Sequence, residues 1–320
     1  MAAAEYLILA ALAFAGLVLV LHHAPGSYPV TTGWLTLSGV GGRGSLPAGL
    51  LIAVYIYSGW DGTLYVNEEV RHRRINPGRA AIAAVTILTL LYVLAFTGLQ
   101  GIVSPARLQA HAADALVYAA HAIAGTAGAR VAAAALAMSV IAATGTSIML
   151  TARIIYGMAS WRTLPGPLAA VSPRFATPVN ASVLTGLLVV AMTWAYLLTA
   201  SVQGAFTAIV DTSGLLFGLF YILTALATIA YYRRRILTSP RDALSLGILP
   251  VAAAGFLAWG LARSVLAAPA AQNWSLAGIT AAGLVLLAAA RYVLRSPFFT
   301  IPREHDTAPP ARANANGHRK

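Results

Sequence analysis

Apolar segments of about 20 residues recur along almost the whole chain, and they constrain the fold more than any other feature. A helix needs about 20 mostly apolar residues to cross a lipid bilayer. The segments that meet this requirement lie at 4–21, 46–70, 80–103, 131–151, 181–198, 205–232, 243–262 and 276–294. The sequence therefore predicts an all-α polytopic membrane protein whose eight transmembrane helices form one domain, residues 1–300.

The composition supports lipid as the solvent for this fold. Of the 320 residues, 59% are hydrophobic and only 9% are charged, whereas soluble domains carry roughly 25% charged residues. The net charge of +12 does not indicate nucleic-acid binding, because the basic residues lie in short runs between apolar segments. The chain has no cysteine and its histidines show no ligand spacing, so we expect neither a metal nor a cofactor.

The basic residues also predict the orientation in the membrane. If the chain crosses at each apolar segment, all but four of the 21 basic residues fall on one side, and the exceptions are Arg43, Arg107, Arg130 and Arg263. The positive-inside rule makes the richer side cytoplasmic. The C-terminus is then cytoplasmic, with residues 301–320 as a disordered polar tail. We expect a short surface helix at Leu108–Ala124 and a proline-rich loop at Tyr156–Pro178.

The predicted helix at 46–70 has an expected break point at its centre, where the chain reads Tyr57-Ser58-Gly59-Trp60-Asp61-Gly62. Each glycine inside a helix costs about 1 kcal/mol relative to alanine. We expect the helix to be broken at 59–62, with about a dozen residues in each half, so that each half reaches the bilayer midplane. Carbonyls freed from the first half would suit an ammonium group, and amides freed from the second would suit an anion.

Two acidic positions on this segment have competing interpretations. A carboxylate at the bilayer centre costs roughly 2.5–3.5 kcal/mol, so Asp61 should face the bundle interior and serve a function. It either contacts substrate or protons, or only caps the second half-helix. Glu69, in the run Asn67-Glu68-Glu69-Val70, is either part of a solvated helix end or an inner latch to a cytoplasmic loop. Trp60 is either a gate or a packing residue.

These runs resemble the sixth helix and following loop of amino acid–polyamine–organocation permeases. The resemblance rests on the glycine–aromatic–acidic run at Gly59-Trp60-Asp61, on Asn67-Glu68-Glu69-Val70 and on Asn76-Pro77-Gly78-Arg79-Ala80. A second stretch is similar to the family's eighth helix and the loop after it. It comprises Thr146-Ser147, Thr151-Ala152-Arg153, Tyr156-Gly157-Met158-Ala159, Leu164-Pro165, Pro173-Arg174-Phe175 and Thr177-Pro178.

The resemblance implies a fold of twelve helices, the first ten forming two inverted repeats of five. This chain would hold helices five to twelve and lack the first four, including the glycine-rich break that receives the substrate carboxylate in the family. The substrate-binding residues implied are Ser58, Gly59, Trp60, Asp61 and Gly62. Thr146 and Ser147 would face that break, although small residues there fit close helix packing equally well. Asp211 would be an outer gate partner or a helix N-cap.

The sequence therefore predicts secondary active transport of amino acids or related amines across the cell membrane by alternating access, with coupling to protons. The expected partners are the substrate, protons and the lipid bilayer, and a separate chain could supply helices one to four. The alternative is a truncated or split permease with no activity of its own. A channel would need a ring or filter of repeated polar residues, and an enzyme would need a catalytic constellation in one membrane layer. Neither pattern is seen in the sequence.

Overall fold

The computed structural model describes residues 2–22, 42–66, 70, 72, 75–111, 114–199 and 201–300. Within these residues the regular structure is entirely helical. The main helices are α1 (Ala2–Leu21), α2 (Gly42–Ile56), α3 (Gly62–Tyr65), α4 (Asn76–Ile102), α5 (Pro105–Ala110), α6 (Ala115–Ser160), α7 (Val179–Thr199), α8 (Val202–Tyr232), α9 (Pro240–Asp242), α10 (Leu249–Ala267) and α11 (Ala270–Ala288). Two π-helical turns, Ala243–Ile248 and Ala289–Val293, precede α10 and follow α11.

The protein is a multi-pass membrane protein. Among the described residues, six helices are long and apolar enough to cross a membrane, at Asn76–Ile102, Ala115–Ser160, Val179–Leu198, Gly204–Tyr232, Pro240–Ala267 and Ala270–Val293. A shorter apolar helix runs from Leu46 to Ile56. The two remaining predicted segments, 4–21 and 46–70, contain α1 and the pair α2 and α3. The count of eight membrane spans stays a prediction, as do the side on which the C-terminus lies and the disorder of 301–320, which lies outside the described residues.

Serine and proline define several helix starts. Ser104 and Ser201 are N-caps, and each hydroxyl accepts a hydrogen bond from the amide three residues further on. Proline occupies the first turn of α4, α5 and α9, where its missing N–H has no intrahelical partner to lose. The serine hydroxyls thus bind free amides of the first helical turn, and proline has no amide hydrogen that would need a partner; lipid could supply no partner for such amides.

The helix predicted at 131–151 is much longer in the structure. α6 runs from Ala115 to Ser160, with non-helical backbone at Ala124 and Gly125. Gly125 has φ +60° and ψ −153°, a conformation that is essentially restricted to glycine. The expected surface helix at 108–124 is therefore split between α5 and the first turns of α6. At the other end the helix continues to Ser160, because the first proline of the loop is Pro165.

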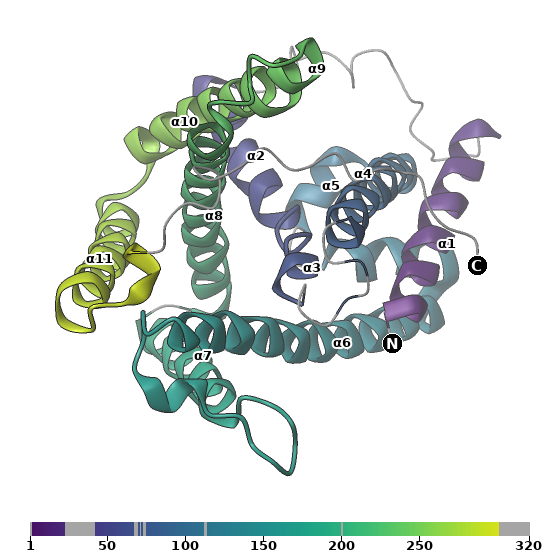
Figure 1. Ribbon diagram of the computed structural model, residues 1–320. Helices are drawn as coiled ribbons and strands as arrows, with labels where there is room; N and C mark the ends of the chain where they lie inside the picture. Colours follow the sequence, from purple (N-terminus) through teal and green to yellow (C-terminus); the bar gives the residue numbers. More distant parts are fainter. Residues whose placement is uncertain are drawn as a thin grey trace, which may run out of the picture.

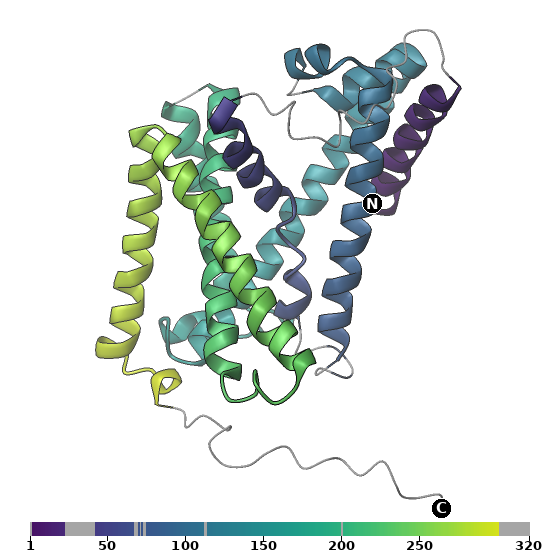
Figure 2. The same cartoon turned by 90° about the horizontal axis from the view of Figure 1, so that it is seen from above.

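The broken segment lies in the middle of the bundle. Both views place α2 and α3 between α8 and α10 on one side and α4 on the other, while α7 and α11 lie at the periphery (Figures 1 and 2). The contacts agree, since α2 packs on α8 and α10, and α3 packs on α4 and α6. Large apolar side chains such as Ile141 and Leu187 are exposed, as expected where lipid replaces water.

Small residues of α8 and α10 allow close contacts that hold α2 in place. A Cβ added to Gly214 of α8 would lie 2.7 Å from the carbonyl oxygen of Leu51, and one added to Gly260 of α10 would clash with Leu50. The buried hydroxyl of Ser264 in α10 donates to the carbonyl of Pro47 at 3.3 Å. Small residues at helix interfaces allow this approach, because hydrophobic burial does not drive helix association in lipid. α2 is therefore fixed by α8 and α10 up to the point where it ends.

Candidate functional site

The backbone leaves the helical path between Ile56 and Gly62. α2 ends at Ile56, residues 57–61 form turns, and α3 begins at Gly62. Gly59 has φ +99°, and no neighbour lies within 4 Å of the place that a Cβ would occupy, so the positive φ alone requires glycine there. Gly62 instead allows close packing, since a Cβ would lie 2.8 Å from Cδ1 of Leu150 in α6 and that side chain would have to move. The two glycines thus act differently, one in the turn and one in packing.

The second half-helix is shorter than the sequence predicts. The sequence predicts about a dozen residues after the break, but α3 is a single turn of four residues, and Val66 leaves the helical region with φ −102° and ψ 13°. One turn gains little from its own hydrogen bonds, because helix nucleation is unfavourable. Its position depends on neighbours. Gly62 packs on Leu150 of α6, and the Thr63 hydroxyl lies 3.5 Å from the carbonyl of Pro77 in α4.

Many backbone groups freed by the break are satisfied within the protein. The Tyr92 hydroxyl of α4 donates to the carbonyl of Ile56 at 2.9 Å, and the Ser58 hydroxyl donates to the carbonyl of Tyr55 at 2.6 Å. Beyond the break, the amides of Gly62 and Leu64 donate to the carbonyls three residues earlier, at 3.1 and 2.8 Å. Most of the backbone carbonyls and amides that were expected to meet a ligand are therefore hydrogen-bonded within the protein, and only a few remain without a partner.

Four backbone groups at the break have no hydrogen-bond partner among the described residues. They are the carbonyls of Tyr57 and Ser58 and the amides of Trp60 and Asp61. The carbonyls precede Gly59 and the amides follow it, so acceptors and donors lie on the two sides of one glycine. Backbone groups at membrane depth need a polar partner. These four are the groups at which a small polar ligand could be bound.

Asp61 is buried and its carboxylate is bound locally. The residue is only 4% exposed. Oδ1 accepts from the amide of Gly59 at 3.1 Å, and Oδ2 accepts a short hydrogen bond from the hydroxyl of Tyr65. The interpretation of Asp61 as a side-chain cap is wrong. It occupies the N-cap position of α3, but its carboxylate makes no capping bond and turns back to Gly59 instead.

No basic side chain neutralises Asp61 in the part of the chain that the structure describes. The ion pairs found there join His111 to Asp114 and Arg235 to Asp242. A buried carboxylate without a cationic partner is unfavourable in its charged form. A cationic ligand group would supply the missing positive charge, and it is compatible with the two hydrogen bonds that Asp61 already accepts.

An aromatic pair links the break to α8. The Trp60 ring stacks on Tyr221, with centroids 6.0 Å apart and an interplanar angle of 28°. Tyr221 also lies against Phe217, at 6.2 Å between centroids. The hydroxyl oxygen of Tyr221 is buried and has no hydrogen-bond partner among the described residues. Trp60 thus packs on Tyr221 in this conformation, and its role as a gate stays a prediction. The Tyr221 hydroxyl is a second buried polar group near the break.

Thr146 and Ser147 lie on α6, and no hydrogen bond joins either side chain to the break among the described residues. Both are exposed on α6, and the Thr146 hydroxyl donates to the carbonyl of Ala142 in its own helix at 2.9 Å. They precede Leu150 by four and three residues, so the three side chains share one helix face. Leu150 is the residue of this face that touches Gly62. A role of Thr146 or Ser147 in coupling stays a prediction.

The other two candidates lie away from this contact. Asp211 is the tenth residue of α8, whose N-cap is Ser201, so the N-cap interpretation of Asp211 is wrong. It precedes Tyr221 by ten residues, about 15 Å along the helix axis, so it does not belong to the aromatic contact at Trp60. Its role as a gate stays a prediction. Glu69 lies outside the described residues.

Sequence reasoning missed Tyr65, Tyr92 and Tyr221. Tyr65 follows Asp61 by four residues, a spacing that brings side chains together on a helix, so this contact had a local signal. Tyr92 and Tyr221 reach the break from α4 and α8, 36 and 161 residues away from their partners Ile56 and Trp60. Nothing in the local sequence marks such a contact.

One comparison with known proteins bears on this site. The sequence model of a family described as amino acid permease matches residues 3–289, which includes the break and every helix that contacts it. No curated protein matches the chain closely enough to count as a relative.

Proposed function

Because the chain belongs to the amino acid permease family, we propose that it transports amino acids or related amines across the membrane by alternating access at the α2–α3 break. Members of such a fold bind substrate near the bilayer midplane, at discontinuous helices whose freed backbone groups meet the ligand. The observation that carries the proposal is the set of four unpaired backbone groups beside the buried Asp61. The carbonyls suit an ammonium group, and the amides suit a carboxylate.

The substrate-binding residues in this proposal are Ser58, Gly59, Trp60, Asp61 and Gly62. Their roles differ. Gly59 provides the turn, Gly62 allows contact with α6, and Trp60 closes one wall by stacking on Tyr221. Ser58 and Trp60 contribute a carbonyl and an amide. Asp61 contributes an amide and the negative charge that a substrate ammonium group or a proton would neutralise.

We also propose that transport is coupled to protons. Substrate ammonium and proton compete for one uncompensated carboxylate, so binding of one favours release of the other. Transport would then depend on pH through Asp61. Movement of the bundle around the break would expose the site to each side in turn, with Thr146, Ser147, Asp211 and Glu69 as candidate coupling or gating positions.

The first test is uptake of radiolabelled amino acids and amines into proteoliposomes that contain the purified chain, with and without an imposed pH gradient. Because substrate and proton compete for one carboxylate, we expect at least one substrate to accumulate faster when the vesicle interior is the more acidic side. Asp61→Asn keeps the size of the side chain and removes its charge, so it should flatten the dependence of uptake on pH. Asp114→Asn is the matched control, because Asp114 is an exposed carboxylate beside His111.

Three outcomes separate the parts of this proposal. Uptake with a flat pH profile in Asp61→Asn, and a normal profile in Asp114→Asn, supports both transport and coupling. An unchanged profile in Asp61→Asn removes Asp61 from coupling and leaves transport standing. Absence of uptake of every amino acid and amine by folded, reconstituted wild-type protein contradicts the transport proposal.

A further inference from the structure

Four arginines gather where the chain turns back between α8 and α10. Arg233, Arg234 and Arg235 follow α8 directly, and Arg241 lies in α9, which leads through the π-helical turn into α10. All four are exposed. We call the stretch from Tyr231 to Asp242 the basic turn, and Asp242 is its single acidic residue. The basic turn therefore carries an excess of positive charge at the end of two membrane-spanning helices.

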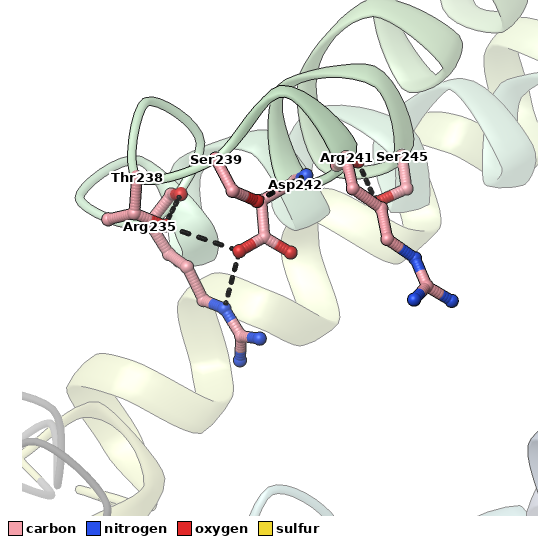
Figure 3. Close-up of polar contacts among 6 residues, drawn as sticks. All are labelled: Arg235, Thr238, Ser239, Arg241, Asp242 and Ser245. Carbon is pink, nitrogen blue, oxygen red and sulfur yellow. Dashed lines mark hydrogen bonds and ion pairs between the residues drawn. The ribbon is translucent and has the colours of Figure 1, made fainter.

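Hydrogen bonds to Asp242 give the basic turn a fixed shape (Figure 3). Oδ2 of Asp242 accepts from Nε of Arg235 and from the Thr238 hydroxyl, both at 3.2 Å. The amide of Asp242 donates to the Ser239 hydroxyl at 3.1 Å. The Thr238 hydroxyl also lies 2.8 Å from the carbonyl of Arg235. The backbone that carries the arginines is thus ordered by contacts on both sides of the turn.

Asp242 neutralises only part of this charge. Among the described residues, the side chain of Arg235 is bonded through Nε, which leaves its terminal nitrogens as donors. The guanidinium group of Arg241 extends away from Asp242 in Figure 3. Guanidinium groups bind phosphate oxygens through paired N–H donors. A phosphate group near the basic turn would therefore meet guanidinium donors that Asp242 does not occupy.

Apolar side chains next to these arginines identify the source of the phosphate. Leu237, within the turn, is 89% exposed, and Tyr231, at the end of α8, is 57% exposed. Leu237 would be poorly placed in water, because apolar surface gains free energy when it leaves water. At the boundary between headgroups and acyl chains the same side chain can enter the acyl region while the arginines remain among the headgroups. Neither a free phosphate nor a nucleic acid would make use of Leu237.

We propose that the basic turn is a binding site for an anionic phospholipid. Arg233, Arg235 and Arg241 donate hydrogen bonds to the headgroup phosphate, and Leu237 inserts beside its acyl chains. Asp242 positions Arg235 and does not itself touch the lipid. The lipid then bridges the ends of α8 and α10, the two helices that pack on α2.

The test is lipid binding to the purified chain in detergent, measured by native mass spectrometry, with dioleoylphosphatidylglycerol and dioleoylphosphatidylcholine as probes. We expect retention of the anionic lipid over the zwitterionic one. Each arginine near a headgroup contributes about a fivefold factor in affinity, so Arg233→Gln with Arg241→Gln should weaken binding of the anionic lipid about 25-fold. Arg233→Lys with Arg241→Lys keeps the charge and should retain most of the binding.

A matched control comes from the same hairpin. Arg263 lies near the far end of α10, 22 residues beyond Arg241, or about 33 Å along the helix, and Arg263→Gln should leave binding unchanged. Leu237→Ser should weaken binding of the lipid but not of any inorganic phosphate. The proposal is overturned if Arg263→Gln weakens binding as much as the double variant, if both lipids bind equally, or if inorganic phosphate displaces the lipid.

Discussion

Glycine supports two opposite kinds of structure in this protein, one in the α1–α4 pair and one in the α2–α3 break. α1 and α4 stay regular, and the absence of a side chain at two glycines lets them approach closely. A Cβ added to Gly98 would lie 2.7 Å from the backbone of Ala13, and one added to Gly16 would clash with Gly98. At the break, Gly59 has free space around it but a φ of +99°. The α1–α4 pair needs glycine because a side chain would clash with the neighbouring helix. The break needs glycine because its backbone has a positive φ.

This difference explains why only one of the two regions offers a site. In two regular helices the peptide groups are hydrogen-bonded within each helix, as lipid requires, so none is left to bind a ligand. The break leaves carbonyls and amides unpaired beside a carboxylate. The distinguishing feature in sequence is the acid. Gly98 and Gly101 flank the uncharged pair Leu99-Gln100, whereas Gly59 and Gly62 flank Trp60-Asp61.

The largest effect should come from adding a methyl group at the contact between α1 and α4. Gly98→Ala places a methyl group within 2.7 Å of the Cα and the carbonyl oxygen of Ala13. Backbone atoms cannot move aside as a side-chain end can, so the helices must separate. We expect a loss of about 2–3 kcal/mol in stability, measured as earlier thermal unfolding in detergent.

The control for this substitution is Gly78→Ala in the first turn of the same helix. Nothing lies within 4 Å of a Cβ there, and alanine favours helix over glycine by about 1 kcal/mol. Gly78→Ala should unfold at or slightly above the wild-type temperature. If Gly98→Ala does the same, the close approach of α1 to α4 is wrong.

The next effect concerns the hydrogen bond that holds Asp61. Tyr65→Phe removes the hydroxyl that donates to Oδ2 and leaves the amide of Gly59 on Oδ1. Losing one hydrogen bond to a buried acceptor costs about 1–2 kcal/mol. We expect this loss in thermal unfolding and, because the carboxylate is held less firmly, roughly tenfold slower uptake in proteoliposomes.

Tyr57→Phe tests whether that effect is specific. Tyr57 lies in the same break, but its hydroxyl donates to Thr89 of α4 at 3.2 Å and not to Asp61. Its loss should change uptake less than Tyr65→Phe does. Equal slowing in the two variants would mean that the break responds to any lost tyrosine hydroxyl, and the position of Asp61 would then be set by its bond to Gly59.

The sequence predicted the break for a physical reason that is local. Glycine and a carboxylate at the centre of an apolar run conflict with a regular membrane helix, and this conflict is visible without any neighbour. The observed turn at 57–61 starts two residues before the expected interruption at 59–62. The length of α3 was not predictable in this way, because a four-residue helix depends on Leu150 and Pro77 for its position.

Features that depend on tertiary packing were missed or misjudged. The pairing of Ile56 with Tyr92 and of Trp60 with Tyr221 joins distant segments, and hydropathy carries no information about which helices are neighbours. Asp211 illustrates the reverse error. It fits a capping residue by type, but the N-terminus of α8 is ten residues earlier, at a serine that caps it. Residue type suggested the function, and the position of the helix end excluded it.

The smallest effect should come from the backbone of Gly59 itself. Gly59→Ala meets no neighbour within 4 Å, so the only penalty is the φ of +99°, which costs an L-residue about 1 kcal/mol. Gly145→Ala in α6 is the matched control, since its surroundings are equally open but its backbone is helical. The unfolding temperature of Gly59→Ala should therefore be slightly below that of the wild type, and that of Gly145→Ala should be equal to it or higher. If the two variants unfold together, the turn at Gly59 does not need a positive φ, and the contrast between its role and that of Gly98 would be lost.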